Sequence, residues 1–254
     1  MITKEQLHSL AKENKISETV IFREYLQLLF LSELYSKKEA TKIFFKGGTA
    51  LHLIYGALRF SEDLDFTVEL EEKDFIGFIS DFLKSLSKKE SINFKERKTI
   101  TGKKFLLTVS PGILPYKSFV SLDFSFREKV IEPQKSFLHT AFPVLFSSYV
   151  YHFSKEEILA EKIRALLTRA KGRDMYDLWF LFNQGVKLNG DLIKEKLKYY
   201  NLLDIDNTEI LEKIKGFSKK DFVLDMRPFL PLYQRDKLPD FFDYLIDFLK
   251  KKLS

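Results

Sequence analysis

Apolar residues recur at helical spacing over several long stretches of the chain. Near the N-terminus, this pattern predicts a helix over residues 3–15, with Thr3 and Gln6 in capping-box spacing, and a second helix over 18–35 that Ser17 caps. The same spacing recurs over residues 71–86, 155–170, 173–183, 190–200, 207–216 and 239–253. The C-terminal part of the chain is therefore expected to be helical.

Short apolar or alternating runs predict strands between these helices. They are an apolar run over residues 43–45, an alternating segment over 59–66, a hairpin of 92–100 and 103–110, and an alternating segment over 118–126. Residues 131–152 contain two prolines and many aromatic side chains and give no clear assignment. We therefore expect an α+β protein, with a sheet-containing domain over residues 1–150 and a helical domain over 151–254.

The composition is that of a globular protein with a modest excess of positive charge. The 254 residues carry a formal net charge of +6, which suits a polyanionic partner. Cysteine is absent, so disulfides and thiolate metal sites are excluded, and the four histidines show no metal-ligand spacing. The N-terminus is too charged for a signal peptide and no apolar run reaches transmembrane length, so we expect a cytoplasmic protein with no membrane partner.

Two aspartates stand one residue apart on a predicted strand. Alternation places Ser61, Asp63 and Asp65 on one face and Leu64 and Phe66 on the opposite, core-facing one. Neighbouring carboxylates repel each other and favour a bound cation, and Mg²⁺ prefers oxygen ligands of this kind. An exposed edge strand, whose charges discourage aggregation, explains the same pattern without a metal.

A Gly-Gly pair precedes this strand. Gly47, Gly48 and Thr49 follow an apolar run and open a short helical stretch that Gly56 closes. A strand, a glycine turn and a helix N-terminus present backbone N–H groups to an anion, and Thr49 can cap the helix or donate its hydroxyl to a phosphate. A tight turn without a ligand explains the glycines alone. The succession of glycines and carboxylates favours a bound nucleoside triphosphate.

A line of cations is predicted on one side of a C-terminal helix. Lys162, Arg169 and Arg173 follow a spacing of seven and then four residues and can hold phosphates or stabilise a leaving pyrophosphate. A solvated basic face is the alternative interpretation. Asp174 and Asp177 fall in the first turns of the next helix, where the helix dipole or pairing with an arginine explains them.

Taken together, these motifs resemble those of polymerase-β-type nucleotidyltransferases, in particular the AbiEii/AbiGii toxin family. The resemblance rests on Gly47-Gly48-Thr49, Arg59, Ser61 and Asp63-x-Asp65, and on residues 160–165 followed by Arg173-Asp174-x-Tyr176-Asp177-Leu178. It spans residues 20–185 and implies a polymerase-β-like core with a mixed sheet, followed by a helical half.

The resemblance also implies roles for individual residues. Nucleotide binding falls to Gly47, Gly48, Thr49, Ser61, Lys162, Arg169 and Arg173, metal binding to Asp63, Asp65 and Asp123, and catalysis to these three aspartates with Lys162 and Asp174. The superfamily takes a third carboxylate from a neighbouring strand, and Asp123 stands at that place in the order. An ordinary polar position on a half-exposed strand explains Asp123 equally well.

The activity implied is a transfer of a nucleoside monophosphate from a nucleoside triphosphate to an acceptor, with Mg²⁺ or Mn²⁺ as cofactor. The 3′ end of tRNA is the acceptor we expect, and a separately encoded antitoxin protein would hold the toxin in check. Two alternatives fit the same residues: nucleotidylation of a small molecule or protein, and a nucleotide- or RNA-binding module without turnover. The intact set of Asp63, Asp65 and Lys162 argues against the module.

Overall fold

The computed structural model describes residues 1–169, 171–202 and 207–253, and the chain forms two compact units. The first unit consists of Met1–Gly56 and Phe60–Phe153. The second consists of Ala57–Arg59 and the described residues from Ser154 onward. Residues 57–59 are thus a brief excursion of the chain into the second unit, because the residues on both sides of them belong to the first. The chain enters the second unit again at Ser154.

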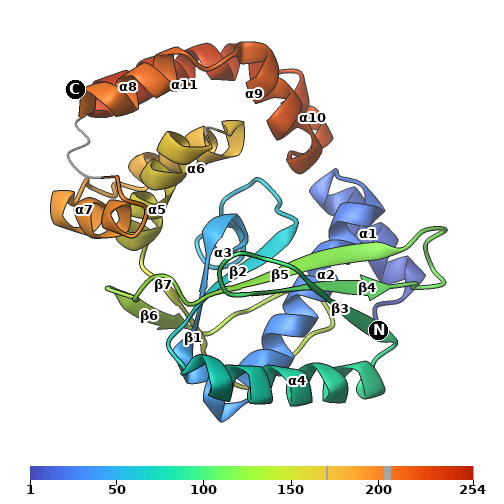
Figure 1. The fold of residues 1–254 in the computed structure, drawn as a ribbon. Helices are drawn as coiled ribbons and strands as arrows, with labels where there is room; N and C mark the ends of the chain where they lie inside the picture. The colour runs from blue at the N-terminus through green and yellow to red at the C-terminus, as the bar shows by residue number, and fades with distance from the viewer. Residues whose placement is uncertain (170, 203–206, 254) are drawn as a thin grey trace. The chain divides into compact units, whose positions relative to one another are not determined.

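Within the described residues, the first unit is built on a mixed sheet of seven strands in the order β3-β4-β5-β2-β1-β7-β6 (Figure 1). The strands are β1 (Ile43–Lys46), β2 (Asp63–Val68), β3 (Ile92–Arg97), β4 (Lys103–Val109), β5 (Ser118–Ser125), β6 (Pro133–Ser136) and β7 (Val150–Phe153). At its centre, β2 runs antiparallel to β1 and parallel to β5, while β1 runs parallel to β7. The α+β prediction with a mixed sheet is confirmed.

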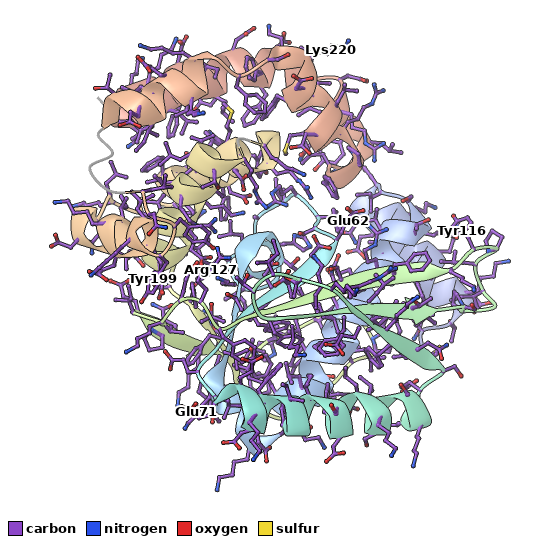
Figure 2. All side chains as sticks on the ribbon, in the orientation of Figure 1. Glu62, Glu71, Tyr116, Arg127, Tyr199 and Lys220 are labelled. Atoms are coloured by element: carbon purple, nitrogen blue, oxygen red, sulfur yellow. The ribbon has the colours of Figure 1, made fainter. Side chains whose placement is uncertain are left out.

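The three longest helices described in the first unit are α1 (Lys4–Asn14), α2 (Glu18–Tyr35) and α4 (Glu72–Lys89). Phe30 of α2 packs against Phe66 of β2 and against Phe82 of α4, with ring centroids 6.3 and 5.6 Å apart. Phe66 in turn stacks on Phe124 of β5 at 4.8 Å. Side chains fill the layer between α4 and the sheet (Figure 2). One face of β2 and β5 is thus committed to an aromatic core, so alternation turns the aspartates of both strands to the other face.

Two predicted helix starts need correction. Thr3 forms the expected capping box with Gln6, but Ser17 makes no side-chain hydrogen bond at the start of α2. Helix α3 (Gly47–Leu53) begins at the first glycine, with Lys46 as its N-cap, so Thr49 is not the cap. The Thr49 hydroxyl instead donates to the backbone carbonyl of Asp63, which joins α3 to the start of β2.

Two predicted strands also differ clearly in their limits. Strand β2 begins at Asp63 rather than at residue 59, and β3 ends at Arg97. Residues 131–152, left without an assignment, contribute β6 and begin β7, each four residues long. Strands this short carry too little alternation to be recognised, and β7 pairs with β1, a strand distant in the sequence, where Phe45 is opposite His152.

The described part of the second unit is helical. Its elements are α5 (Lys155–Thr168), α6 (Gly172–Asn183), α7 (Gly190–Lys198), α8 (Asn207–Lys215), α9 (Lys219–Met226), η2 (Arg227–Phe229), α10 (Leu232–Arg235) and α11 (Leu238–Leu253). The predicted helices of this half are confirmed, whereas α9, η2 and α10 were missed; η1 (Lys38–Lys42) of the first unit was missed too. Residue 170, the predicted end of the helix now seen as α5, lies outside the described residues. No helix in the described ranges is both long and apolar enough to cross a membrane.

Candidate active site

The candidate site of the first unit lies where β2 starts, and the sheet register decides which side chains meet there. Asp65 is directly opposite Asp123 of β5, and Asp63 is opposite Ser121. On its other side, Asp65 faces Lys46, the last residue of β1. Asp63 is exposed, and Asp65 and Asp123 are half-buried. Three carboxylates therefore occupy one face of two adjacent strands.

The first glycine of α3 touches this acidic face. Gly47 has φ of +79°, and a Cβ at this position would lie 2.5 Å from Oδ2 of Asp65. Only glycine both adopts this backbone conformation without strain and leaves room for the carboxylate. The Gly-Gly segment and the acidic strand, separate in the sequence, are thus in contact within the first unit.

Two further charged pairs border these residues and were missed in the sequence. Nζ of Lys104, which is opposite Asp123 in the β4–β5 register, lies 3.4 Å from Oδ2 of Asp123. Lys46 is buried, with Nζ 3.9 Å from the buried carboxylate of Glu128 and 5.2 Å from the ring centroid of Phe153. The position of Lys46 directly before the glycine pair could have indicated its role from the sequence. No sequence pattern pointed to Glu128.

Ser61 does not lie on the strand, contrary to the alternation argument, because the ladder starts two residues later. Its backbone carbonyl accepts a hydrogen bond from Nε2 of Gln27 at 3.1 Å. The neighbouring Glu62, which Figure 2 labels, places Oε1 2.7 Å from Nη1 of Arg23. Both contacts anchor the segment before β2 to helix α2.

A divalent metal fits the donor chemistry of the acidic face, although no three His, Cys, Asp or Glu side chains of the described residues gather as ligands of one ion. Mg²⁺ usually takes only one or two protein carboxylates and completes its shell with water and substrate phosphates. Asp63 and Asp65 supply such a pair, with Asp123 on the adjacent strand. The residues are therefore suited to a hard divalent ion that takes its remaining ligands from outside the protein.

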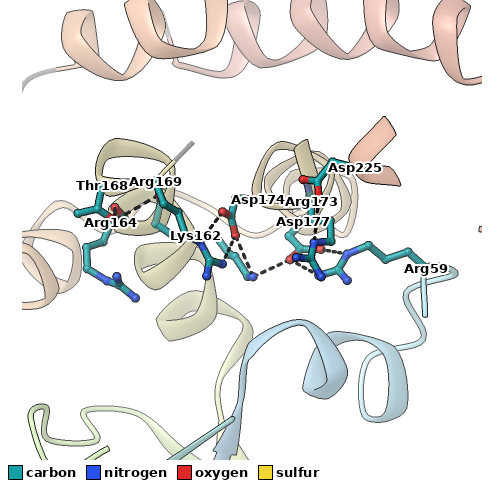
Figure 3. A network of polar contacts seen from close by, with 10 residues as sticks. Arg59, Lys162, Arg164, Thr168, Arg169, Arg173, Asp174, Asp177 and Asp225 are labelled. Atoms are coloured by element: carbon teal, nitrogen blue, oxygen red, sulfur yellow. Dashed lines mark hydrogen bonds and ion pairs between the residues drawn. The ribbon is translucent and has the colours of Figure 1, made fainter. Parts of the chain in front are cut away.

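The second unit contains a buried network of alternating charges (Figure 3). Nζ of Lys162, on α5, lies 2.7 Å from Oδ2 of Asp177 and 3.3 Å from Oδ1 of Asp174. Asp174 also accepts two hydrogen bonds from Arg169, from Nε at 3.0 Å and Nη2 at 2.9 Å. Lys162 and both aspartates are buried, whereas 55% of the Arg169 side chain is exposed.

These charges set the protonation of Asp174. Burial by itself raises the pKa of this carboxyl, but the charges of Lys162 and Arg169 and their hydrogen bonds outweigh burial. The pKa of Asp174 is therefore held well below its usual value. Asp174 is an anion at any physiological pH and accepts hydrogen bonds rather than donating a proton.

Asp177 has a second partner that the sequence suggested only as an unnamed arginine. Arg59, from the three-residue excursion of the chain, donates to both carboxylate oxygens of Asp177, from Nε at 2.6 Å and Nη2 at 2.5 Å (Figure 3). Burial alone lowers the pKa of Arg59, but Asp177 more than compensates and raises it. Asp177 thus contacts both Arg59 and Lys162, and its contact with Lys162 is shorter than that of Asp174.

The three cations that were predicted to lie in a line do not all lie together. Arg169 ends α5 as its C-cap and turns to Asp174, so it stays beside Lys162. Arg173 instead places Nε 3.5 Å from Oδ1 of Asp225 on α9 and its guanidinium 4.7 Å from the ring of Phe229. Tyr176 is buried, and burial raises its pKa to about 12, while Trp179 is half-buried.

Comparison with known proteins gives a family and a fold. Residues 29–247 match the family model described as nucleotidyl transferase AbiEii toxin, type IV toxin–antitoxin system. The fold is similar to JHP933 from Helicobacter pylori, with a TM-score of 0.52 and 20% identity over 93% of this chain and 95% of that one.

A second solved structure with a similar fold is MenT4, the nucleotidyltransferase toxin Rv2826c from Mycobacterium tuberculosis H37Rv. Its TM-score is 0.59 at 17% identity, over 97% of this chain and 90% of that one. At such identities, likeness between structures concerns the fold alone. No curated protein gives a significant match to the chain.

Proposed function

Because the chain belongs to the AbiEii family of nucleotidyltransferase toxins of type IV toxin–antitoxin systems, we propose that it transfers a nucleoside monophosphate from a nucleoside triphosphate to the 3′ end of a tRNA. The observation that carries this proposal is the contact between Gly47 and Asp65, with Asp123 opposite Asp65 on the next strand. It joins a glycine segment suited to phosphate with carboxylates suited to a metal.

We assign the chemistry of the first unit to these residues. Gly47 and Gly48 bring backbone close to the triphosphate, and Asp63 and Asp65 hold Mg²⁺, or Mn²⁺ in its place. The metal, when bound, neutralises charge on the phosphates. The acceptor hydroxyl attacks the α-phosphorus, the bond to the bridging β-phosphate oxygen breaks, and pyrophosphate leaves. Asp123 either completes the metal shell or accepts the proton of the attacking hydroxyl.

The contacts of Thr49 and Ser61 within the protein bear on their proposed role as nucleotide ligands. The Thr49 hydroxyl donates its proton to the Asp63 carbonyl, so contact with phosphate would require that bond to break. Ser61 precedes β2 and is held through its backbone by Gln27. We keep both as proposed ligands, with Thr49 acting through its backbone N–H.

In the second unit, we propose that Lys162 and Arg169 bind the triphosphate and stabilise charge on the departing pyrophosphate. Asp174 and Asp177 hold the ammonium of Lys162 in place; a lysine paired this way has its direction fixed before substrate arrives. Arg173 stays a candidate nucleotide ligand, although it is paired with Asp225. Residues 1–150 would thus act as the nucleotidyltransferase core and 151–254 as the domain that contributes the lysine and Arg-Asp motifs.

The partners follow from the family. A type IV toxin implies an antitoxin protein and a nucleoside triphosphate substrate. We further propose that the reaction takes place in the cytoplasm, where tRNA and nucleoside triphosphates are found, and that the basic excess of +6 assists RNA binding.

The test is incubation of the purified protein with total RNA and each α-³²P-labelled nucleoside triphosphate in turn, with Mg²⁺ or with EDTA. We expect label on a tRNA-sized band with Mg²⁺ and none with EDTA. Because the metal supplies several kcal/mol of charge stabilisation, Asp65→Ala should lower labelling by about 100-fold or more. Asp81→Ala, which removes an exposed carboxylate on α4, is the matched control and should label normally.

Other outcomes distinguish the alternatives. Label on a small molecule or protein instead of RNA identifies a different acceptor. Nucleotide binding with no label on any acceptor supports a binding module. Full labelling by Asp65→Ala contradicts the assignment of the acidic strand.

A further inference from the structure

One edge of the sheet in the first unit ends in exposed aromatic rings. Strand β6 is the last strand of the sheet, and its register with β7 pairs Ser136 with Val150. The residues just beyond this pair, Phe137 and Tyr149, have ring centroids 6.2 Å apart at an interplanar angle of 85°. Phe137 is 45% exposed and Tyr149 is 48% exposed. Large apolar rings on a protein surface indicate an interaction site when they cluster.

Positive charge accompanies these rings. Nζ of Lys135 lies 4.9 Å from the centroid of the Tyr149 ring, and the ring of His139 lies 5.2 Å from that of Phe137. Residues 133–153 contain no aspartate or glutamate, although acidic residues occupy 36 of the 254 positions in the chain. Helix η1 packs on β7 and adds two lysines and one glutamate. Nothing in the segment itself therefore repels an anion.

We propose that Lys135, Phe137 and Tyr149, which we call the aromatic edge, bind a single-stranded segment of RNA. Bases stack on exposed aromatic rings and cations meet the phosphates between them, which is how proteins hold single strands without reading their sequence. A protein partner would use the rings too, but it has no need of a carboxylate-free segment or of an ammonium over a ring. The proposal rests on the proposed function for its partner, which is the acceptor RNA.

The sheet also fixes how far the aromatic edge lies from the acidic face. Strands β1 and β7 lie between β2 and β6, so three strand spacings separate the acidic strand from β6. Along β6, Pro133 pairs with Phe153, the last residue of β7, and Phe137 lies four residues beyond Pro133. Three strand spacings across and four residues along give a separation on the order of 20 Å. The aromatic edge would therefore hold nucleotides several positions back from the reacting 3′ end.

The test measures RNA affinity without nucleotide, by fluorescence anisotropy of a short fluorescein-labelled oligouridine added to the full-length protein. Each ring removed, in Phe137→Ala or Tyr149→Ala, should weaken binding by about 5-fold to 100-fold. Tyr149→Phe keeps the ring and should bind normally. Lys135→Ala should lower the slope of log affinity against log salt by about 0.7, the value for one phosphate on a single strand.

Phe119→Ala is the matched control, because Phe119 lies on β5 of the same unit and is 43% exposed. It should bind RNA as the wild type does, and circular dichroism should show all variants folded. Wild-type affinity in a folded Phe137→Ala, Tyr149→Ala double variant overturns the proposal, and would leave a protein as the partner of this surface. Equal losses in the double variant and in Phe119→Ala overturn it as well.

The aromatic edge and the proposed function fail in distinguishable ways. Wild-type protein that labels RNA, while the double variant still binds oligouridine normally, refutes the edge and leaves the function intact. Loss of oligouridine binding in the double variant, with no RNA labelling by the wild type, supports the edge and refutes the RNA acceptor.

Discussion

At the scale of single residues, the site depends on a glycine whose role cannot be filled by another residue. Gly47 lies against the carboxylate of Asp65 and has a left-handed backbone conformation. These are two separate requirements, one for the backbone and one for space. Gly56 meets only the backbone requirement, because its φ is +77° and a Cβ added there would have nothing within 4 Å.

We predict that Gly47→Ala and Gly56→Ala lose similar stability but differ in activity. Both place an L-residue in the left-handed region, at a cost of about 1–2 kcal/mol in the free energy of unfolding. Only Gly47→Ala forces the carboxylate of Asp65 to move, and a displacement of that kind should lower labelling by about 100-fold. Urea unfolding and the labelling assay measure the two effects. Equal activities of the two variants would contradict the role given to Gly47.

A second prediction at this scale concerns acid. The pKa of Asp174 is lower in the folded protein than its usual value of 3.8, so the unfolded state binds more protons as the pH falls. The stability that Asp174 contributes is fully present above its unfolded pKa and is lost progressively as the pH falls below it. The urea midpoint of the wild type should therefore fall more steeply than that of Asp174→Asn between about pH 5 and pH 3. Parallel curves would show that Asp174 is not held as an anion.

At the scale of elements, side-chain hydrogen bonding distinguishes the serines at the N-cap positions of α5 and α2. Oγ of Ser154 accepts a hydrogen bond from the backbone N–H of Glu157 at 2.9 Å at the start of α5, the helix of Lys162. Ser17 makes no such bond at the start of α2. The start of α5 is thus held by its cap, whereas α2 is held by its buried apolar face.

Ser154→Ala should therefore cost about 1 kcal/mol in the free energy of unfolding. Ser17→Ala should cost a few tenths at most, since no hydrogen bond is lost. The difference between their urea midpoints checks the prediction. If Ser17→Ala proves the more destabilising, the cap assignments are wrong.

The elements also show how far the sequence could be interpreted. Long periodic segments such as 18–35 and the hairpin of β3 and β4 were predicted because their side-chain pattern is local. Strands β6 and β7 were missed because four residues carry little pattern and β7 depends on pairing with a distant strand. The aspartate pair was found for the same reason as the helices, by spacing. The arginine that pairs with Asp177 could not be named from the sequence, because Arg59 and Asp177 stand 118 positions apart.

At the scale of the whole molecule, the proposed activity can be tested in living cells. A toxin of this family acts on its own host, so activity inside the cell can be measured as growth. We predict that induced expression of the wild type lowers colony formation and that Asp65→Asn, at a similar protein level, does not.

Asp81→Asn, with an exposed carboxylate on α4, should remain as toxic as the wild type. Toxicity that persists in Asp65→Asn would mean that harm to the cell comes from binding rather than from nucleotidyl transfer.

The brief excursion of residues 57–59 has a consequence for how such a protein can be taken apart. A gene cut at the codon for Ser154 does not separate the two compact units, because Arg59, the buried counter-ion of Asp177, is encoded far upstream. Transfer of the helical half alone onto another enzyme would leave Asp177 without Arg59. Recombination at this junction should therefore give chimeras that are less stable than the parent protein.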